Sequence, residues 1–264
     1  MKTIETAYSS CPNDTFIFHA MINGVVDTKN YSFLPYTGDV EDLNIRAFSG
    51  LHPVTKMSYH AYLHLRNRYT TLDSGSALGH GCGPLLVAKN DRSDFGRMLV
   101  AAPGRYTTAH LLLKLWKPEA TNIVFARFDE ILQGVADGKF DAGLIIHEGR
   151  FVYPGYGLVK LVDLGEWWET ETGLPIPLGC IAVRNDMAGT RSEIGSILRS
   201  SVEYAIKNPD VSRNYIKSLA QEMDDEVISE HIRLYVNEYT IDLGKKGRSA
   251  VERLEKMASL RGII

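Results

Sequence analysis

Short apolar runs alternate with amphipathic stretches along the first half of the chain. The apolar runs predict strands at 3–8, 31–36, 54–57, 85–89, 99–102, 123–126 and 142–146. Between them, apolar residues recur at helical spacing and predict helices at 13–23, 40–49, 59–67, 109–116 and 128–135. Strands and helices that alternate over such short distances are typical of an α/β fold with a mainly parallel sheet.

After residue 189 only helical periodicity remains, and it predicts helices at 191–206, 211–219, 225–239 and 248–261 that cover the first part of the fold. The domain organisation is suggested by a short internal echo, because the sequence reads CGPLLVAKND from Cys82 and CIAVRND from Cys180. We interpret the two segments as strands that cross between two lobes. The prediction is a larger lobe of 1–91 plus 184–264, a smaller inserted lobe of 92–183, crossing strands near 85–89 and 181–184, and a ligand cleft between the lobes.

Composition and charge narrow the range of partners. The chain has 29 Lys plus Arg against 32 Asp plus Glu, a formal charge of −3, which gives no electrostatic basis for binding nucleic acid or an anionic membrane. Its apolar runs are far shorter than the ~20 residues of a membrane helix, and polar residues interrupt the start of the chain where a secretory signal would be apolar. We therefore expect a cytoplasmic protein with a small-molecule substrate and make no prediction of its oligomeric state.

The residues that commonly bind metals give no metal-site pattern. Cys11, Cys82 and Cys180 are too far apart for a CxxC zinc motif and cannot all pair, so free thiols in a reducing compartment are expected. His60 and His64 lie four residues apart on a predicted helix, but no HExxH glutamate accompanies them. A solvated or core-edge histidine pair is favoured over a pair of metal ligands.

Polar residues gather where the predicted strands end, which is where ligands bind in open α/β sheets. Those singled out are Ser9, Ser10, Asn13, Lys56, Ser58, Ser74, Ser76, Thr107, Thr108 and His147. Small hydroxyls and unpaired amides at helix starts suit a carboxylate or a phosphate. For any single Ser or Thr ordinary helix capping is the favoured explanation, so only the convergence of several loops favours an anion site.

His147 follows the apolar run 142–146, which places an imidazole on a rigid strand at the mouth of the expected cleft. That position suits a general base, because an imidazole with a pKa of ~6.5 is largely neutral near pH 7. Lys56 stays protonated unless it is desolvated, so Lys56 or Ser58 is better placed to stabilise an oxyanion. A hydrogen-bonded structural histidine is the alternative, since no triad partner can be located in the sequence.

Several motifs resemble those of one enzyme family. The segment SCPNDTFIFH, which begins at Ser10, resembles the SPCPNDT-F-FHA opening of the 1,4-dihydroxy-6-naphthoate synthases, with Ser9-Ser10 in place of Ser-Pro. The agreement continues in register through KMSY at Lys56, SGSALG at Ser74, Pro103-Gly104 with Thr107-Thr108, and residues 141–148. The related chorismate dehydratases share the fold and some of these landmarks.

The resemblance implies two α/β lobes like those of type II periplasmic binding proteins, in agreement with the lobes inferred from the echo. It implies a lyase of the futalosine route to menaquinone, which converts cyclic dehypoxanthinyl futalosine to 1,4-dihydroxy-6-naphthoate and a three-carbon sugar fragment without a metal or organic cofactor. The family's proton acceptor corresponds to His147, and its substrate-binding segments correspond to Lys56, Met57 and Ser58 and to Thr107 and Thr108. The alternatives are a chorismate dehydratase of the same superfamily and a non-catalytic small-anion-binding protein, which would need an export signal.

Overall fold

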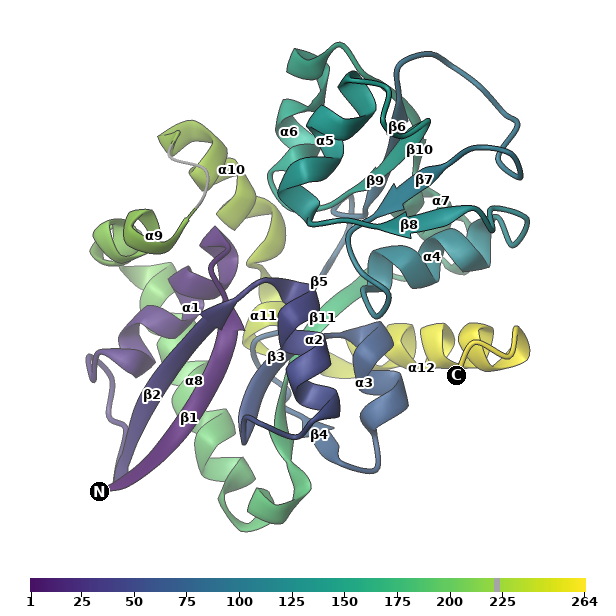
Figure 1. The fold of residues 1–264 in the computed structure, drawn as a ribbon. Helices are drawn as coiled ribbons and strands as arrows, with labels where there is room; N and C mark the ends of the chain where they lie inside the picture. Colours follow the sequence, from purple (N-terminus) through teal and green to yellow (C-terminus); the bar gives the residue numbers. More distant parts are fainter. Residues whose placement is uncertain (221–223) are drawn as a thin grey trace.

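The computed structural model, which describes residues 1–220 and 224–264, folds into two lobes that are each built around their own β-sheet (Figure 1). The strands of the larger lobe are β1 (Lys2–Ser9), β2 (Tyr31–Gly38), β3 (Val54–Ser58), β4 (Tyr69–Thr71), β5 (Ala77–Gly79) and β11 (Ile176–Arg184). Those of the smaller lobe are β6 (Leu85–Ala88), β7 (Val100–Ala102), β8 (Ile123–Phe125), β9 (Ala142–Ile145) and β10 (Val159–Asp163). The predicted α/β class is confirmed.

The helices follow the expected order along the chain. The larger lobe carries α1 (Pro12–Ile22), α2 (Val40–Phe48), α3 (Tyr59–Leu65), α8 (Arg191–Lys207), α9 (Arg213–Leu219), α10 (Asp225–Tyr235), α11 (Glu238–Ile241) and α12 (Gly244–Leu260). The smaller lobe carries α4 (Thr108–Trp116), α5 (Phe128–Ala136), α6 (Gly149–Val152) and α7 (Leu164–Thr172). The helix expected over 225–239 is divided, because Asn237 forms a capping box that starts α11 after α10 has ended. In the described part of the chain, no helix has the length and apolar character to cross a membrane.

Both sheets are mixed, whereas a mainly parallel sheet was expected. The larger sheet has the order β2-β1-β3-β11-β4, with β5 paired to β11, and β11 runs antiparallel to all three of its neighbours. The smaller sheet has the order β10-β6-β9-β7-β8, and β6 runs antiparallel to both β9 and β10. The reason lies in the lobe connections: β6 and β11 each begin on the side where the lobes meet, which is the side where β1, β3 and β9 end (Figure 1).

The connections between the lobes do not lie where the echo placed them. β6 belongs wholly to the smaller sheet although it precedes residue 92, and β11 belongs wholly to the larger sheet although it begins before residue 184. The chain therefore crosses at 80–84 and again between α7 and β11, so neither 85–89 nor 181–184 is a crossing strand. An apolar run indicates that a strand is buried on both faces, but it does not indicate which sheet the strand joins.

The first connection between the lobes packs against the start of α7. The amide of Leu164 donates a hydrogen bond to the carbonyl oxygen of Pro84 at 2.9 Å. A Cβ on Gly83 would lie 2.2 Å from the backbone nitrogen of Gly165, so no side chain fits between the two backbones at this point. Only glycine allows so close an approach.

An apolar core continues from one lobe into the other. One buried cluster includes Met57 of β3, Cys180 of β11 and Leu112 of α4. A second cluster packs α1 and α8 against the larger sheet, through residues such as Phe18 and Leu198. The lobes are therefore joined by shared apolar packing as well as by the two connections.

Candidate active site

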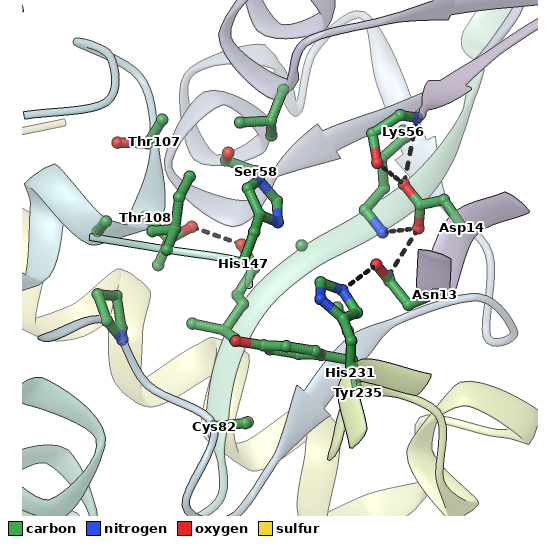
Figure 2. A pocket seen from close by; sticks show the side chains of 18 residues that line it. Asn13, Asp14, Lys56, Ser58, Cys82, Thr107, Thr108, His147, His231 and Tyr235 are labelled. Atoms are coloured by element: carbon green, nitrogen blue, oxygen red, sulfur yellow. Dashed lines mark hydrogen bonds and ion pairs between the residues drawn. The ribbon is translucent and has the colours of Figure 1, made fainter. Parts of the chain in front are cut away.

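A cleft lies between the lobes, on the side where β1, β3 and β9 end (Figure 2). Both lobes contribute to its walls, and the contribution of the larger lobe includes α10. Its polar lining residues are Ser9, Asn13, Asp14, Lys56, Ser58, Thr107, Thr108, His147 and His231. The expected strand-end location of the site is thus the location of the cleft.

Asp14 anchors the polar network on the larger-lobe side of the cleft. It lies in the first turn of α1, where the unpaired amides and the helix dipole favour a negative charge. Its Oδ2 accepts hydrogen bonds from the amide and the hydroxyl of Ser9, at 3.2 and 2.7 Å, and its Oδ1 lies 2.5 Å from Nζ of Lys56. Both charged side chains are buried, so each supplies the counter-charge that the other needs.

Asn13 connects this ion pair to His231 of α10. Its Nδ2 donates to Oδ1 of Asp14 at 3.0 Å, and its Oδ1 lies 2.9 Å from Nε2 of His231. Burial holds the pKa of His231 well below its usual range, and the neighbouring His147 and Lys56 lower it further. The ring of His231 is therefore neutral at physiological pH.

His147 stands at the carboxyl end of β9, facing the larger lobe. Its φ of +56° is a left-handed backbone conformation that costs free energy in a residue other than glycine, and such strain gathers at functional sites. Its Nδ1 lies 3.4 Å from Sγ of Cys11, whereas Nε2 is buried without a hydrogen-bond partner in the described part of the chain. Burial lowers the pKa of His147 to about 4, with a contribution in the same direction from Lys56 and an opposing one from Asp14.

Ser58 presents a hydroxyl at the end of β3. Its amide donates to Oδ1 of Asn44 at 2.9 Å, and its Oγ accepts from Nδ2 of Asn44 at 3.1 Å. The same Nδ2 donates to Oε2 of Glu41 at 3.0 Å, and the Glu41 carboxylate accepts from the amide of Tyr106 in the smaller lobe, with Oε1 at 3.0 Å. Because Oγ of Ser58 is used here as an acceptor, its proton can be donated into the cleft.

The hydroxyls of Thr107 and Thr108 are engaged within the protein. Oγ1 of Thr107 donates to the carbonyl oxygen of Gly104 at 2.9 Å and caps α4 by accepting from the amide of His110. Oγ1 of Thr108 donates to the carbonyl oxygen of Leu178 in the larger lobe at 2.6 Å. What α4 offers to a ligand is therefore its first-turn backbone amides rather than these two hydroxyls.

Of the residues expected to bind substrate, Asn13, Lys56, Ser58, Thr107 and Thr108 line the cleft, as does the expected base His147. Ser10, Met57, Ser74 and Ser76 are outside its lining. Met57 points into the apolar core, because side chains alternate between the two faces of β3.

The glycine-rich segment that contains Ser74 and Ser76 packs inside the protein rather than around a ligand. Ser74 donates to the carbonyl oxygen of Ile241 at 2.5 Å, and Oγ of Ser76 lies 2.9 Å from the Tyr59 hydroxyl. A Cβ on Gly75, whose φ is +88°, would lie 2.6 Å from the side chain of Ile181. The glycine is needed for this close approach.

Sequence reasoning did not single out Asp14, His231 or Tyr235 as functional residues, although all three line the cleft. Asp14 is part of the CPND motif, which indicates the family but not the role of this carboxylate. His231 and Tyr235 lie on the buried face of α10 together with Ile228, and a histidine on an apolar helix face indicates a buried position without indicating that it borders a cleft.

Known proteins resemble this chain along almost its entire length. A family model described as menaquinone biosynthesis matches residues 4–260. A Thermus thermophilus protein named 1,4-dihydroxy-6-naphthoate synthase is 47% identical over 100% of this chain and 96% of its own length. A Streptomyces coelicolor protein of the same name is 42% identical over 99% of this chain and 95% of its own length.

Solved structures support the fold. A crystal structure of an Archaeoglobus fulgidus protein superposes with a TM-score of 0.94 at 39% identity, covering 99% of this chain and 98% of that chain. The periplasmic aliphatic sulphonate-binding protein of Escherichia coli superposes with a TM-score of 0.66 at 9% identity, covering 100% of this chain and 89% of that chain. The second likeness concerns the fold alone, and it confirms the predicted periplasmic-binding-protein-like architecture.

Proposed function

This chain belongs to the menaquinone-biosynthesis enzyme family, and we propose that it acts as a 1,4-dihydroxy-6-naphthoate synthase. In this proposal it is a lyase that converts cyclic dehypoxanthinyl futalosine to 1,4-dihydroxy-6-naphthoate and a three-carbon sugar fragment. The sequence similarity to two synthases along almost the whole chain supports cyclic dehypoxanthinyl futalosine, rather than chorismate, as the substrate. The cytoplasmic location expected from the sequence stays a prediction.

The observation that carries the mechanism is the buried Nε2 of His147 beside the cleft, which has no hydrogen-bond partner among the residues that the structure describes. With Nδ1 protonated and donating to Sγ of Cys11, Nε2 has a free lone pair and serves as the general base. Burial keeps the thiol of Cys11 protonated by raising its pKa, so it does not compete as an anion. The lowered pKa of His147 keeps the imidazole in its basic form throughout the physiological range.

The proton that His147 removes lies next to a carbonyl group of the substrate, so its loss gives an enolate. The electron pair then collapses to expel the sugar fragment as the ring becomes aromatic, and aromatisation drives the step forward. Ser58 is placed to donate to the developing oxyanion, because its hydroxyl already accepts from Asn44. Lys56 contributes less directly, since its ammonium is held by Asp14.

The substrate carboxylate fits the start of α4, where Ala109 and the two threonines line the cleft. The first amides of a helix have no intrahelical acceptor, and the helix dipole favours an anion there.

His147→Asn tests the proposal. The variant is expected to fold and to bind cyclic dehypoxanthinyl futalosine, but to lose about 10²–10⁴-fold in turnover, which is the usual contribution of a positioned proton acceptor. Product formation is followed by absorbance and mass. His19→Asn is the matched control, because the ring of His19 packs against Tyr215, outside the cleft lining, and its turnover should stay at the wild-type value.

Three results would change the assignment. If the wild-type enzyme turns over chorismate and does not turn over cyclic dehypoxanthinyl futalosine, it is a dehydratase. Tight binding without any turnover would identify a binding protein. Wild-type turnover by a folded His147→Asn protein would transfer the role of base to another residue, and Glu148 would be tested next.

A further inference from the structure

His231 is a buried histidine on a helix that lies far along the sequence from the strand-end residues of the cleft. It lies on α10 and is 1% exposed, yet it lines the cleft. Its ring is nearly parallel to that of His147, with an interplanar angle of 14° and ring centroids 6.2 Å apart. The two imidazoles therefore face the same part of the cleft from different lobes (Figure 2).

The hydrogen-bond network determines which nitrogen of His231 carries the proton. Asp14 is paired with Lys56, so it is an ionised carboxylate that only accepts hydrogen bonds. Asn13 must then direct its Nδ2 toward Asp14, since the reverse orientation would place two oxygens against each other. The Oδ1 of Asn13 is left to face His231 and can only accept, so Nε2 of His231 is the protonated donor.

In a neutral imidazole with a proton on Nε2, Nδ1 is a bare acceptor. Nδ1 of His231 is buried and has no hydrogen-bond partner among residues 1–220 and 224–264. An unsatisfied buried acceptor is unfavourable, so this position is suited to a donor that arrives with a ligand. A carboxylate has no proton to offer and would be repelled by the nitrogen lone pair, whereas a hydroxyl group has the required proton.

We propose that Nδ1 of His231 accepts a hydrogen bond from a hydroxyl group of the substrate, and so holds the hydroxylated, sugar-derived part of the substrate beside His147. The proposal rests on the proposed function, because it assumes a substrate that carries both a sugar-derived part and a carboxylate. It also separates the two ends of the substrate: the hydroxylated end lies between the two histidines, and the carboxylate lies at the start of α4. His231 is in this view a substrate-binding residue that determines specificity for a donor group.

Two variants of His231 test the roles of its two ring nitrogens separately. Glutamine places its amide near the position of Nε2, so His231→Gln can keep the bond to Asn13 while losing the acceptor at Nδ1. Asparagine places its amide near the position of Nδ1, so His231→Asn can keep an acceptor for the substrate while losing the bond to Asn13. A purely structural role for His231 makes the opposite prediction, because the bond to Asn13 would then be the one that matters.

The measurements are kcat and KM for cyclic dehypoxanthinyl futalosine, together with the denaturant midpoint of each variant. We expect His231→Gln to raise KM about tenfold with a near wild-type midpoint, as the loss of one hydrogen bond at a buried partner predicts. His231→Asn is expected to keep KM within about threefold of wild type while lowering the midpoint.

The inference is overturned by a folded His231→Gln protein with wild-type KM, or by a His231→Asn protein whose KM rises by as much as that of the glutamine variant. If His231→Gln does not fold, the asparagine variant decides alone: a KM within about threefold of wild type supports the inference, and a rise of about tenfold overturns it. Failure of the proposed function is a different result, in which the wild-type enzyme itself does not turn over this substrate.

Discussion

Thr108 of the smaller lobe donates a hydrogen bond of 2.6 Å to the main-chain oxygen of Leu178 in the larger lobe. Both residues line the cleft, so this bond closes the two lobes directly beside the binding site. Thr108 also accepts a hydrogen bond from the amide of His60 at 3.3 Å, which makes its hydroxyl a two-sided link between the lobes.

Thr108→Val keeps the shape of the side chain but removes both hydrogen bonds, and it leaves the carbonyl oxygen of Leu178 without this donor. A typical net hydrogen bond contributes about 1 kcal/mol, so we expect KM to rise roughly fivefold through weaker closure. Thr108→Ser retains the hydroxyl and serves as the control with near wild-type KM. A valine variant with unchanged KM would show that this bond does not affect substrate affinity.

Glu41 joins the lobes at a second point, through the amide of Tyr106. Glu41→Ala removes a charge-assisted hydrogen bond worth about 1.5–3 kcal/mol, so the ligand-free protein should open and its radius of gyration in small-angle X-ray scattering should increase. Asp42→Ala is the matched control, because the Asp42 carboxylate accepts hydrogen bonds from Arg46 and Tyr36, which both belong to the larger lobe. Identical scattering curves for the two variants would contradict the interlobe role of Glu41.

Two histidines that are buried in the neutral form make the fold sensitive to acid. Burial lowers the pKa of His147 to about 4 and that of His60 to about 3. In the unfolded chain both have pKa values of ~6.5. Between these pH values the unfolded state binds more protons than the folded state. The free energy of unfolding therefore has its full value above pH ~6.5 and decreases as the pH is lowered below it.

The measurement is the denaturant midpoint from pH 7 to pH 4.5. In the wild type the free energy of unfolding should decrease steadily below pH ~6.5, and His147→Asn should reduce the slope by up to ~1.4 kcal/mol per pH unit, the contribution of one proton. Parallel curves for the two proteins would mean that His147 titrates alike in the folded and unfolded states.

The strand-end rule located much of the site because it depends on local order along the chain. Lys56 and Ser58 lie in the last residues of β3, Asn13 and His147 come shortly after β1 and β9, and all four line the cleft. His231 could not be placed in this way, because the face of α10 that meets the cleft is decided by its packing against α1 and β5.

The lobe boundaries and the glycine-rich segment depend equally on long-range packing. β6 and β11 have similar sequences but join different sheets, and only their partners distinguish them. The glycines around Ser74 did indicate a close approach, yet the group that approaches is the Ile181 side chain rather than a ligand. A high density of glycines indicates that another group approaches the backbone closely, but it does not indicate which group this is.

In the pairing of β5 with β11, Gly79 at the end of β5 lies opposite Ile176 at the start of β11, so the two ends of the smaller-lobe segment lie side by side. The chain therefore enters and leaves the smaller lobe at neighbouring positions, so the whole unit can be exchanged for that of a relative by joining two adjacent backbones. An exchange of this kind would replace His147 and the start of α4 together, while Asp14, Lys56 and His231 remain in the larger lobe. The proposed proton acceptor and the proposed hydroxyl-binding residue are therefore free to be inherited separately, which gives this architecture a simple route from one reaction to another.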